Sequence, residues 1–218
     1  MIEQRISKEN TAKARWASTS PRDLNDQQWV SAEPILLEKY WSGETAPPER
    51  QASARVLWNE TGLYVLFRCV QREDLVVEHE PQTSRKVIGL WDRDVCEVFL
   101  APEQATPSRY FEFEAAPSGE WLDIKIHKTE EGRESDWEFK SGMSVTANVE
   151  LDRVLISMFI PWSSEIPKPC ARDIWRANFF RCVGIGERRG YLAWQPTFTE
   201  EPSFHVPEAF GWLRFESD

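Results

Sequence analysis

The stretch Tyr110–His127 reads YFEFEAAPSGEWLDIKIH, and its alternation of side chains decides the fold class. Glutamates alternate with aromatic residues before the turn, and Leu122, Ile124 and Ile126 alternate with polar residues after it. The residues Pro117–Gly119 between the two halves are typical of a turn. A period of two is that of a β-strand with one face in the core and one in water. The stretch therefore predicts an antiparallel hairpin.

Two further pairs of β-prone runs lie on either side of this hairpin in the sequence. Residues 52–58 and 63–70 flank a short turn-rich connection, and residues 145–151 and 154–160 flank a short polar one. Runs of this length joined by short turns are typical of hairpins. No segment repeats apolar residues with the period of an amphipathic helix over three turns or more. We therefore predict an all-β chain, a two-sheet antiparallel β-sandwich with one or two short helical turns.

Charge and hydropathy exclude several partners. The formal charge of −10 lacks the positive footprint that proteins use to bind nucleic acid or an anionic membrane. The longest apolar runs fall short of the roughly 20 residues that cross a bilayer, and Met1–Ile6 lacks the apolar stretch of a signal peptide. We expect no nucleic-acid partner and no membrane span. As written, the sequence predicts a cytoplasmic protein, or an extracellular or periplasmic one if a leader has been removed.

The cysteines do not form a metal-binding motif. The set comprises Cys69, Cys96, Cys170 and Cys182, and it lacks the close paired spacing of a zinc site. Three of the four lie inside apolar runs, where free cysteine packs as a small hydrophobic residue. Buried thiols are therefore favoured, and a single bridge between Cys69 and Cys96 stays open as the alternative.

Eleven tryptophans are several times the usual share of this residue, and three of them have polar neighbours. Alternation places Trp121 on the polar face of its strand with Asp123 and Lys125, so it either covers charged neighbours or belongs to a binding surface. Trp91 opens a charged stretch, where a functional role is favoured. Trp194 ends a predicted strand and is equally consistent with a structural and a functional role.

Carboxylates beside aromatic residues suit the chemistry of sugar binding. A pyranose ring has an apolar face of C–H groups and a belt of hydroxyls, and an ionised carboxylate accepts strong hydrogen bonds from hydroxyls. Glu97 faces away from the apolar residues next to it in its strand. Glu112 and Glu114 are expected on the polar face with Trp121, where a solvated surface is favoured over a ligand site.

Two basic residues are further candidates for this site. Arg181 stands among apolar residues and needs an acidic partner if it is buried. Such an arginine could orient Glu97, contact a sugar or form a purely structural ion pair. His205, next to Phe204, could donate a hydrogen bond to a sugar hydroxyl, although a lone histidine in a loop is more often uninvolved.

Three segments together resemble the family 9 carbohydrate-binding modules found on bacterial xylanases. They are ARVLWNE with LYVL at residues 54–66, WDRDVCEVFL at residues 91–100, and PEAFGWLRF at residues 207–215. Their order and spacing extend the resemblance over residues 24–215. The resemblance implies a β-sandwich at residues 24–218, with residues 1–23 as an N-terminal extension packed on it.

In this family, two tryptophans sandwich a terminal sugar ring and polar side chains bind its hydroxyls. The resemblance implies that Trp91 is one stacking residue, that Glu97 binds hydroxyls and that Phe204 stands at the second stacking position. Phenylalanine offers a smaller apolar face and no indole N–H, so Trp121 or Trp194 could compensate. The implied partner is a mono-, oligo- or polysaccharide, bound without catalysis, and small soluble sugars are expected to bind weakly.

This interpretation requires no cofactor, but calcium stays open because members of the family sometimes bind it. Asp92, Asp94 and Glu97 supply carboxylate oxygens at a loop and a strand start. They lack the glycine-punctuated spacing of a calcium loop. The sequence specifies neither the sugar nor the oligomeric state.

Two other functions stay open. A glycoside-active enzyme would need paired carboxylates facing each other across a cleft, and an acidic chain offers many such pairs without selecting one. The sequence has no phosphate-binding glycine loop, no serine-nucleophile elbow and no zinc-binding helix motif. A haem-binding electron-transfer domain on the same sandwich would need an axial pair such as Met143 or Met158 with His127 or His205.

Overall fold

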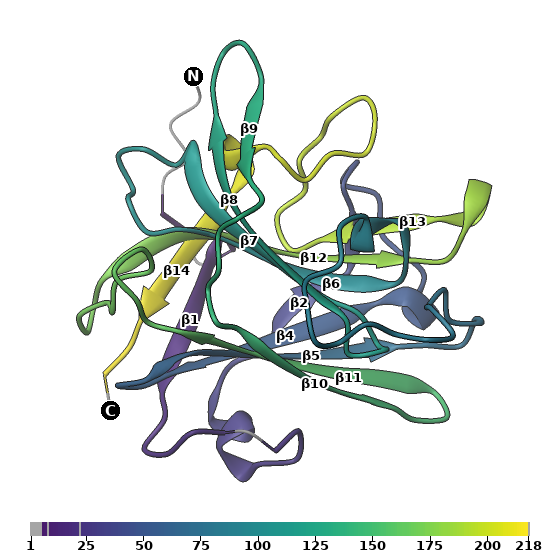
Figure 1. Ribbon diagram of the computed structural model, residues 1–218, viewed down its shortest axis with the longest axis horizontal. Helices are drawn as coiled ribbons and strands as arrows, with labels where there is room; N and C mark the ends of the chain where they lie inside the picture. Colours follow the sequence, from purple (N-terminus) through teal and green to yellow (C-terminus); the bar gives the residue numbers. More distant parts are fainter. Residues whose placement is uncertain (1–5, 8, 22, 218) are drawn as a thin grey trace.

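The computed structural model describes residues 6–7, 9–21 and 23–217, and nearly all of its regular structure is β-strand (Figure 1). The strands are β1 (Thr11–Trp16), β2 (Ile35–Leu37), β3 (Lys39–Tyr40), β4 (Ala52–Trp58), β5 (Gly62–Val70), β6 (Val95–Ala101), β7 (Arg109–Ala115), β8 (Trp121–Lys128), β9 (Arg133–Asp136), β10 (Ser144–Val149), β11 (Arg153–Pro161), β12 (Ile174–Val183), β13 (Gly190–Ala193) and β14 (Gly211–Phe215). The helical segments of the described residues are the 3-10 turns η1 (Gln27–Ser31), η2 (Pro48–Arg50), η3 (Leu90–Asp92), η4 (Gly186–Arg188) and η5 (Pro207–Ala209). The prediction of an all-β chain with short helical turns is confirmed. None of these turns has the length and apolar character needed to cross a membrane.

The strands form two packed layers joined along one edge (Figure 1). The order of strands is β10-β11-β5-β4 in the first layer and β12-β6-β7-β8-β9 in the second. Strands β1 and β14 connect the layers, because β1 pairs in parallel with both β4 and β14, while β14 pairs antiparallel with β12. The two layers therefore belong to one continuous hydrogen-bonded path.

The N-terminal segment contributes a strand to this path. The sequence alone places residues 1–23 outside the sandwich, as an extension packed on it. In the structure Thr11–Trp16 form β1, which lies between the two layers' edge strands and is hydrogen-bonded to both. This part of the segment is therefore integral to the sheet, which corrects the expectation, whereas residues 1–5, 8 and 22 lie outside the described part of the chain.

The three hairpins predicted from alternation are present as the pairs β4–β5, β7–β8 and β10–β11. In β7–β8 the register pairs Glu114 with Leu122 and Ala115 with Trp121. Residues directly opposite each other in an antiparallel pair share a face of the sheet. Leu122 therefore lies on the face of Glu114, and Trp121 lies on the other face.

The core lies between the two layers. Val98, Phe113 and Phe179 of the second layer pack in one cluster with Val56 and Phe67 of the first, and all five side chains are fully buried. Removal of this apolar surface from water is the main driving force for folding.

The outer face of the first layer is covered by a segment that precedes β2. Leu57, Tyr64 and Leu155 project from this face and pack with Leu24 and Trp29. Trp29 lies in η1 and is 1% exposed. This outer face is therefore a second apolar layer of packing.

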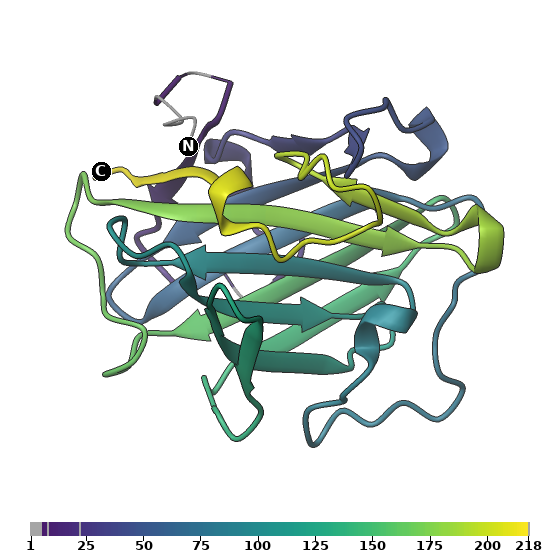
Figure 2. The ribbon, with the colours of Figure 1, turned by 90° about the horizontal axis from the view of Figure 1, so that it is seen from above.

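The outer face of the second layer is covered by the segment before β14, which Figure 2 shows in yellow running across the strands. Phe204 and Phe210 of this segment pack on Phe180 and its neighbours. Both faces of β7 are consequently buried, and Glu112 and Glu114 are only 4% and 0% exposed. The expectation of a solvated outer face for these two residues is wrong, because segments distant in the sequence cover it.

Candidate functional site

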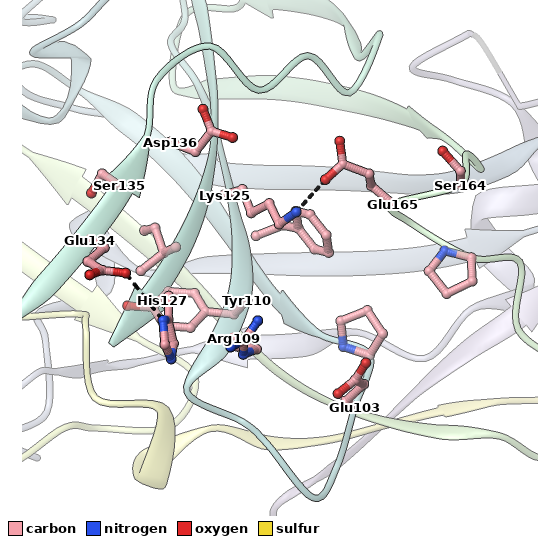
Figure 3. Close-up of a pocket in the computed structure, with 14 residues that line it drawn as sticks. Glu103, Arg109, Tyr110, Lys125, His127, Glu134, Ser135, Asp136, Ser164 and Glu165 are labelled. Carbon is pink, nitrogen blue, oxygen red and sulfur yellow. Dashed lines mark hydrogen bonds and ion pairs between the residues drawn. The ribbon is translucent and has the colours of Figure 1, made fainter. Parts of the chain in front are cut away.

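Strand β8 contributes residues to two cavities. The larger, of about 600 Å³, lies between the β8–β9 hairpin and the segment after β11 (Figure 3). Two pairs of charged side chains in it satisfy each other, since Lys125 pairs with Glu165 and His127 pairs with Glu134. All four side chains are well exposed to solvent. We therefore place the candidate site in the second cavity, where polar groups are buried.

The second cavity, of about 310 Å³, opens on the outer face of the second layer. Its rim comes from η3, from the β9 region and from the segment before η5. Its walls are aromatic and its floor, where β6 and β7 run side by side, carries carboxylates. The lining side chains with most to offer a ligand are Trp91, Trp137, Tyr191, Phe204, Glu97, Glu112, Arg133 and His205.

Trp91 is held at the rim by its backbone. It is the second residue of η3, and η3 begins directly after Gly89, whose φ of 86° is in the left-handed region that favours glycine. The guanidinium of Arg189 donates hydrogen bonds to the backbone oxygens of Trp91 and Arg93. The half-buried ring of Trp91 lies 6.2 Å from that of Trp137, at an interplanar angle of 44°. The two indoles together form one aromatic wall.

Phe204 and Tyr191 form a second aromatic group. Phe204 is 8% exposed because its ring stacks on Phe180 at 4.0 Å with an interplanar angle of 11°. Tyr191 is half-buried and meets Phe204 edge-on at 6.1 Å. Most of the Phe204 ring is thus covered by its own neighbours, and Tyr191 is the more exposed of the two residues.

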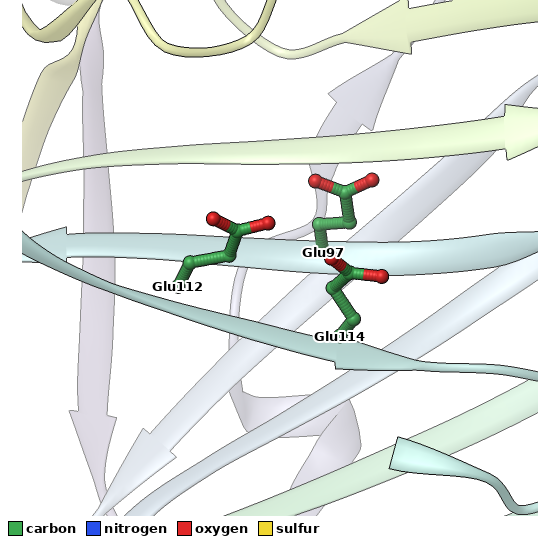
Figure 4. Close-up of side chains that lie close together, drawn as sticks. All are labelled: Glu97, Glu112 and Glu114. Carbon is green, nitrogen blue, oxygen red and sulfur yellow. The ribbon is translucent and has the colours of Figure 1, made fainter. Parts of the chain in front are cut away.

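Three glutamates gather at the floor of the cavity. Glu97 of β6 is directly opposite Glu114 of β7, and Glu112 lies two residues along β7 on the same face. One carboxylate oxygen from each lies within 4.8 Å of the others, and Figure 4 shows the three carboxyl groups side by side. Glu97 and Glu112 line the cavity, whereas Glu114 is not one of its lining residues. Strand register therefore forces three acids together in a buried place.

These carboxylates have few partners among the described residues. The Cys182 thiol lies 3.5 Å from one oxygen of Glu97. Both oxygens of Glu114 and Oε2 of Glu112 are buried without any hydrogen-bond donor. Glu112 and Glu114 can bond to each other only if one of them carries a proton. A buried acid without a partner is costly, so this floor needs protons, a cation or a ligand.

The pKa of each glutamate is raised. Burial is the largest cause for all three residues. The neighbouring carboxylate of Glu112 raises the pKa of Glu97 further, and both other glutamates raise that of Glu114. The exposed guanidinium of Arg133 at the rim opposes the shift at Glu112. The cluster therefore takes up protons more readily than glutamates in water do.

His205 is a neutral side chain beside this floor. Burial, with the positive charges of Arg133 and Lys128, lowers the pKa of His205 to about 3. Its Nε2 lies 3.9 Å from Glu112, but a neutral imidazole forms no ion pair. Arg133 donates to Nε2, so Nδ1 carries the proton and donates to the hydroxyl of Tyr110 at 2.9 Å. His205 is thus fixed in one tautomer at the cavity wall.

Four of the residues proposed from the sequence come together here: Trp91, Glu97, Phe204 and His205. Trp121 does not, because the β7–β8 register places it on the other face of the layer from Glu112 and Glu114. Its indole N–H donates to the backbone oxygen of Thr83, and its ring packs at the border of the core. The expectation that Trp121 shares a face with the glutamates is wrong because the turn sets the opposite pairing.

Trp194 and Arg181 also face away from the cavity. The ring of Trp194 packs edge-on against Phe179, on the core side of the second layer. Arg181 is paired with Cys96, so it lies on the opposite face from Glu97. Its guanidinium donates to the backbone oxygens of residues 50 and 70 and to the Gln71 side chain. Neutral acceptors thus replace the acidic partner expected from the sequence, and Arg181 cannot orient Glu97.

The oxygen ligands suggested for calcium are distributed differently from the expectation. Asp92 lies at the cavity rim, whereas Asp94 is buried and accepts a hydrogen bond from the backbone N–H of Gly184 at 2.8 Å. Asp94 lies three residues before Glu97 in the chain, so the two side chains point to opposite faces of the sheet. The group of possible metal ligands that the described residues bring together is Glu97, Glu112 and Glu114.

Sequence reasoning missed Trp137, Tyr191 and Arg133 as site residues. Trp137 and Arg133 lie in or beside β9, whose sequence is short, charged and without alternation. Tyr191 lies in β13, next to the strand that carries Cys182. A signal was present only for Tyr191, since it adjoins the predicted strand end at Trp194.

Comparisons with solved structures agree with this fold. The chain is similar to a family 9 carbohydrate-binding module from Caldicellulosiruptor kristjanssonii solved with cellotriose, at 14% identity and a TM-score of 0.64, covering 95% of this chain and 94% of that one. The same description holds for a structure solved with glucose, at 15% identity, a TM-score of 0.64, and 95% and 96% coverage. A proposed carbohydrate-binding protein from Bacteroides uniformis is similar at 18% identity and a TM-score of 0.72, covering 95% and 99%.

Comparisons of sequence give the family. An "Extracellular protein" of Arthroderma benhamiae is 23% identical over 190 residues, which cover 79% of this chain and 83% of that protein. The family described as carbohydrate family 9 binding domain-like matches residues 23–217. Because the match spans nearly the whole chain and the strands form the corresponding sandwich, this protein belongs to the carbohydrate family 9 binding domain-like family.

Proposed function

We propose that the protein binds carbohydrate without cleaving it, and that one sugar unit occupies the cavity at Trp91. The observation that carries this proposal is the combination of a half-buried indole wall with buried carboxylate oxygens on one floor. Family membership supports it, and so do the structural neighbours solved with cellotriose and glucose.

The chemistry of the cavity matches that of a pyranose. Trp91 and Trp137 offer apolar faces to the C–H groups of the ring, and Glu97 and Glu112 offer acceptors to its hydroxyls. The volume of about 310 Å³ is at the small end of ligand pockets, which run from about 300 to 1,000 Å³. The cavity therefore suits one or two sugar units rather than a long internal stretch of polysaccharide.

The arrangement of the acids favours binding over hydrolysis. A glycosidase places two carboxyl groups on opposite sides of the bond that it breaks. Glu97, Glu112 and Glu114 instead lie on one floor, with oxygens within 4.8 Å of one another. Their position on one floor supports binding over hydrolysis.

Electron transfer through haem has less support. Met143 and Met158 are buried in the cluster between the layers, whereas His205 lies on the outer face of the second layer. The structure therefore does not bring Met158 and His205 together as an axial pair.

We also propose that the protein works outside the cytoplasm. The relative in Arthroderma benhamiae described as extracellular supports this location. A soluble or polymeric glycan would be available to the cavity there. Fractionation of the native host would test the location directly.

Calorimetry with glucose and cellotriose tests the binding function. We expect weak binding, with dissociation constants from about micromolar to millimolar, because small ligands contribute limited free energy per atom. Trp91→Ala should lose this binding, and Trp121→Phe is the matched control because it changes an aromatic residue on the other face. Equal affinities of the wild type and Trp91→Ala would reject the site. If the wild type hydrolyses a chromogenic glycoside and Glu97→Gln does not, the protein is an enzyme and the proposal of binding without cleavage is wrong.

A further inference from the structure

The three glutamates at the cavity floor bring together more negative charge than the surrounding protein neutralises. Glu97, Glu112 and Glu114 are 2%, 4% and 0% exposed. His205 Nε2 lies 3.9 Å from Glu112, and no ion pair to Glu97 or Glu114 is formed by the described residues. Buried carboxylates in proteins are normally paired, protonated or bound to metal. The described residues thus leave two of the three glutamates without an ion pair.

The spacing of the carboxylates matches that of ligands around one ion. Oxygens that bind calcium lie 2.3 to 2.6 Å from it, so two ligands of the same ion are at most roughly 5 Å apart. One oxygen from each glutamate lies within 4.8 Å of the others. A cation between them can therefore contact all three carboxylates at once.

The side chain of Glu114 is the second observation in favour of a cation. It is fully buried, and neither of its oxygens has a hydrogen-bond donor among the residues that the structure describes. It does not line the cavity, so a sugar would not reach it as directly as it reaches Glu97 and Glu112. One of its oxygens lies within 4.8 Å of oxygens of Glu97 and Glu112, so an ion held by those two residues can also contact Glu114.

We propose that Glu97, Glu112 and Glu114 bind one divalent cation of calcium size at the floor of the cavity. The site is distinct from the set Asp92, Asp94 and Glu97 that the sequence suggests. Three carboxylates fill only part of the six to eight positions of calcium. Water fills the remaining positions when the cavity is free, and sugar hydroxyls can replace that water because Glu97 and Glu112 line the cavity.

The ligand chemistry favours hard cations over zinc. All three ligands are carboxylates, whereas zinc sites in proteins commonly use thiolate and imidazole. Cys182 lies 3.5 Å from one oxygen of Glu97, but the ligand atoms that lie within 4.8 Å of one another all belong to carboxylates. Calcium is therefore expected to bind more tightly than zinc.

Metal binding can be measured without any sugar. The wild-type chain, stripped with a chelating resin, is titrated with calcium, magnesium and zinc chlorides by calorimetry. We expect one calcium per chain and a rise in the melting temperature on binding. The variant Glu114→Gln should weaken calcium binding at least about tenfold, because it removes a charged ligand at nearly constant volume. Asp92→Asn is the matched control, since it removes a cavity carboxylate outside the cluster.

The outcomes separate this inference from the proposed function. Calcium uptake with no sugar binding would support the metal site and reject the sugar site. Sugar binding with no calcium uptake by the stripped wild type would overturn the metal site. Protons shared among the three glutamates would then neutralise the floor of the cavity. The wild-type titration decides the question even if Glu114→Gln fails to fold. Equal calcium affinity of Glu114→Gln and the wild type would also overturn the inference.

A separate observation concerns two cysteines in the core between the layers. The Sγ atoms of Cys69, on β5, and Cys96, on β6, lie 3.4 Å apart, and both residues are 2% exposed. They come from different layers of the sandwich. The hydrogen bond from Cys96 and the charge of Arg181 lower the pKa of the Cys69 thiol. The two sulfur atoms therefore lie close together across the core of the folded chain.

We infer that Cys69 and Cys96 form a disulfide between the layers when the chain folds under oxidising conditions. The thiolate of one cysteine attacks a small-molecule disulfide such as oxidised glutathione and releases one reduced thiol. The second cysteine then attacks the mixed disulfide and releases another, so one external disulfide is reduced as one protein disulfide forms. This exchange takes place during folding, because the folded chain buries both sulfur atoms.

Refolding in oxidised or reduced glutathione tests this bond. We expect oxidative refolding to remove two hydrogen atoms from the intact mass and to link the peptides of Cys69 and Cys96. The melting temperature should rise by about 10 °C, because the bond closes a loop of moderate length. Cys170→Ser, which alters an exposed cysteine, should behave as the wild type, and Cys69→Ser should show no linkage. Alkylation of both thiols after oxidative refolding would overturn the inference.

Discussion

The outer faces of the two layers are both covered, yet one is closely packed and the other contains a cavity. On the first layer, Trp29 is 1% exposed and packs with aliphatic and aromatic side chains. On the second, Trp91 is half-buried at the rim of a cavity whose floor carries buried glutamates. Coverage of a sheet face alone therefore does not make a site. The second face differs because its covering segments leave space above charged groups.

The largest expected effect is on the closed face. Trp29→Ala removes a fully buried indole and should lower the free energy of unfolding by about 3 to 5 kcal/mol. Urea unfolding followed by tryptophan fluorescence measures this loss. The sugar affinity of the folded variant should not change, because Trp29 lies on the other layer. A loss below about 1 kcal/mol would show that the two faces are packed more alike than we conclude.

The second prediction concerns the charge under the open face. The pKa of Glu114 is raised in the folded chain above its ordinary value of 4.5. As the pH rises past 4.5, the unfolded chain therefore loses the proton of Glu114 while the folded chain keeps it. Stability of the metal-free protein should therefore fall as pH rises from about 4.5 toward neutrality. Glu114→Gln cannot ionise, so it should be more stable than the wild type by about 1 to 3 kcal/mol near neutral pH.

Below about pH 4 the two proteins should have similar stability, because Glu114 is protonated in both states of the wild type. Saturating calcium should reverse the order near neutral pH, since only the wild type keeps all three ligands. Chemical unfolding across this pH range, with and without calcium, measures both effects. A wild type that is more stable than Glu114→Gln near neutral pH without metal would contradict the uncompensated charge.

The third prediction separates stability from binding at Trp91. Trp91→Ala should change the free energy of unfolding by less than about 1 kcal/mol, because the ring is half-buried at a rim. Its sugar affinity should fall at least about tenfold, equivalent to about 1.4 kcal/mol. Thermal unfolding and calorimetry give the two values. The contrast with Trp29→Ala would vanish if Trp91→Ala destabilised the fold as strongly.

The smallest effect is expected at Arg133. Arg133→Gln removes an exposed charge that helps to lower the pKa of His205, so this pKa should rise but stay below its ordinary value of 6.5 because burial is the larger cause. Nuclear magnetic resonance of the imidazole against pH measures the shift. The free energy of unfolding should change by less than about 0.5 kcal/mol. An unchanged pKa would mean that Arg133 does not act on this side of the cavity.

Much of the fold could be predicted from short-range pattern. Alternation in Tyr110–His127 and in the runs on either side located the three hairpins, and the absence of a helical period excluded α-helices. Alternation does not say what covers a face, however. Trp29 and Phe204 cover the two layers from segments without regular pattern, and only the folded chain shows where these segments lie.

The candidate site was predictable where it depended on one strand and not where it depended on pairing. Trp91 and Glu97 are close in sequence and reach the same cavity. Trp121 was misplaced because the side that it faces follows from the register at the turn, which pairs it with Ala115. Arg181 was misplaced for the same reason, since its pairing with Cys96 puts it across the layer from Glu97.

Strand β1 has a practical consequence for work on this domain. The family match begins at residue 23, so a fragment cut at that boundary would lack Thr11–Trp16. Strands β4 and β14 would each lose a partner, and the hydrogen bonds that join the two layers through β1 would be absent. Unpaired strand edges invite association with other chains. A shortened domain whose boundary is chosen by homology alone would thus be prone to aggregate, even if its cavity stayed intact.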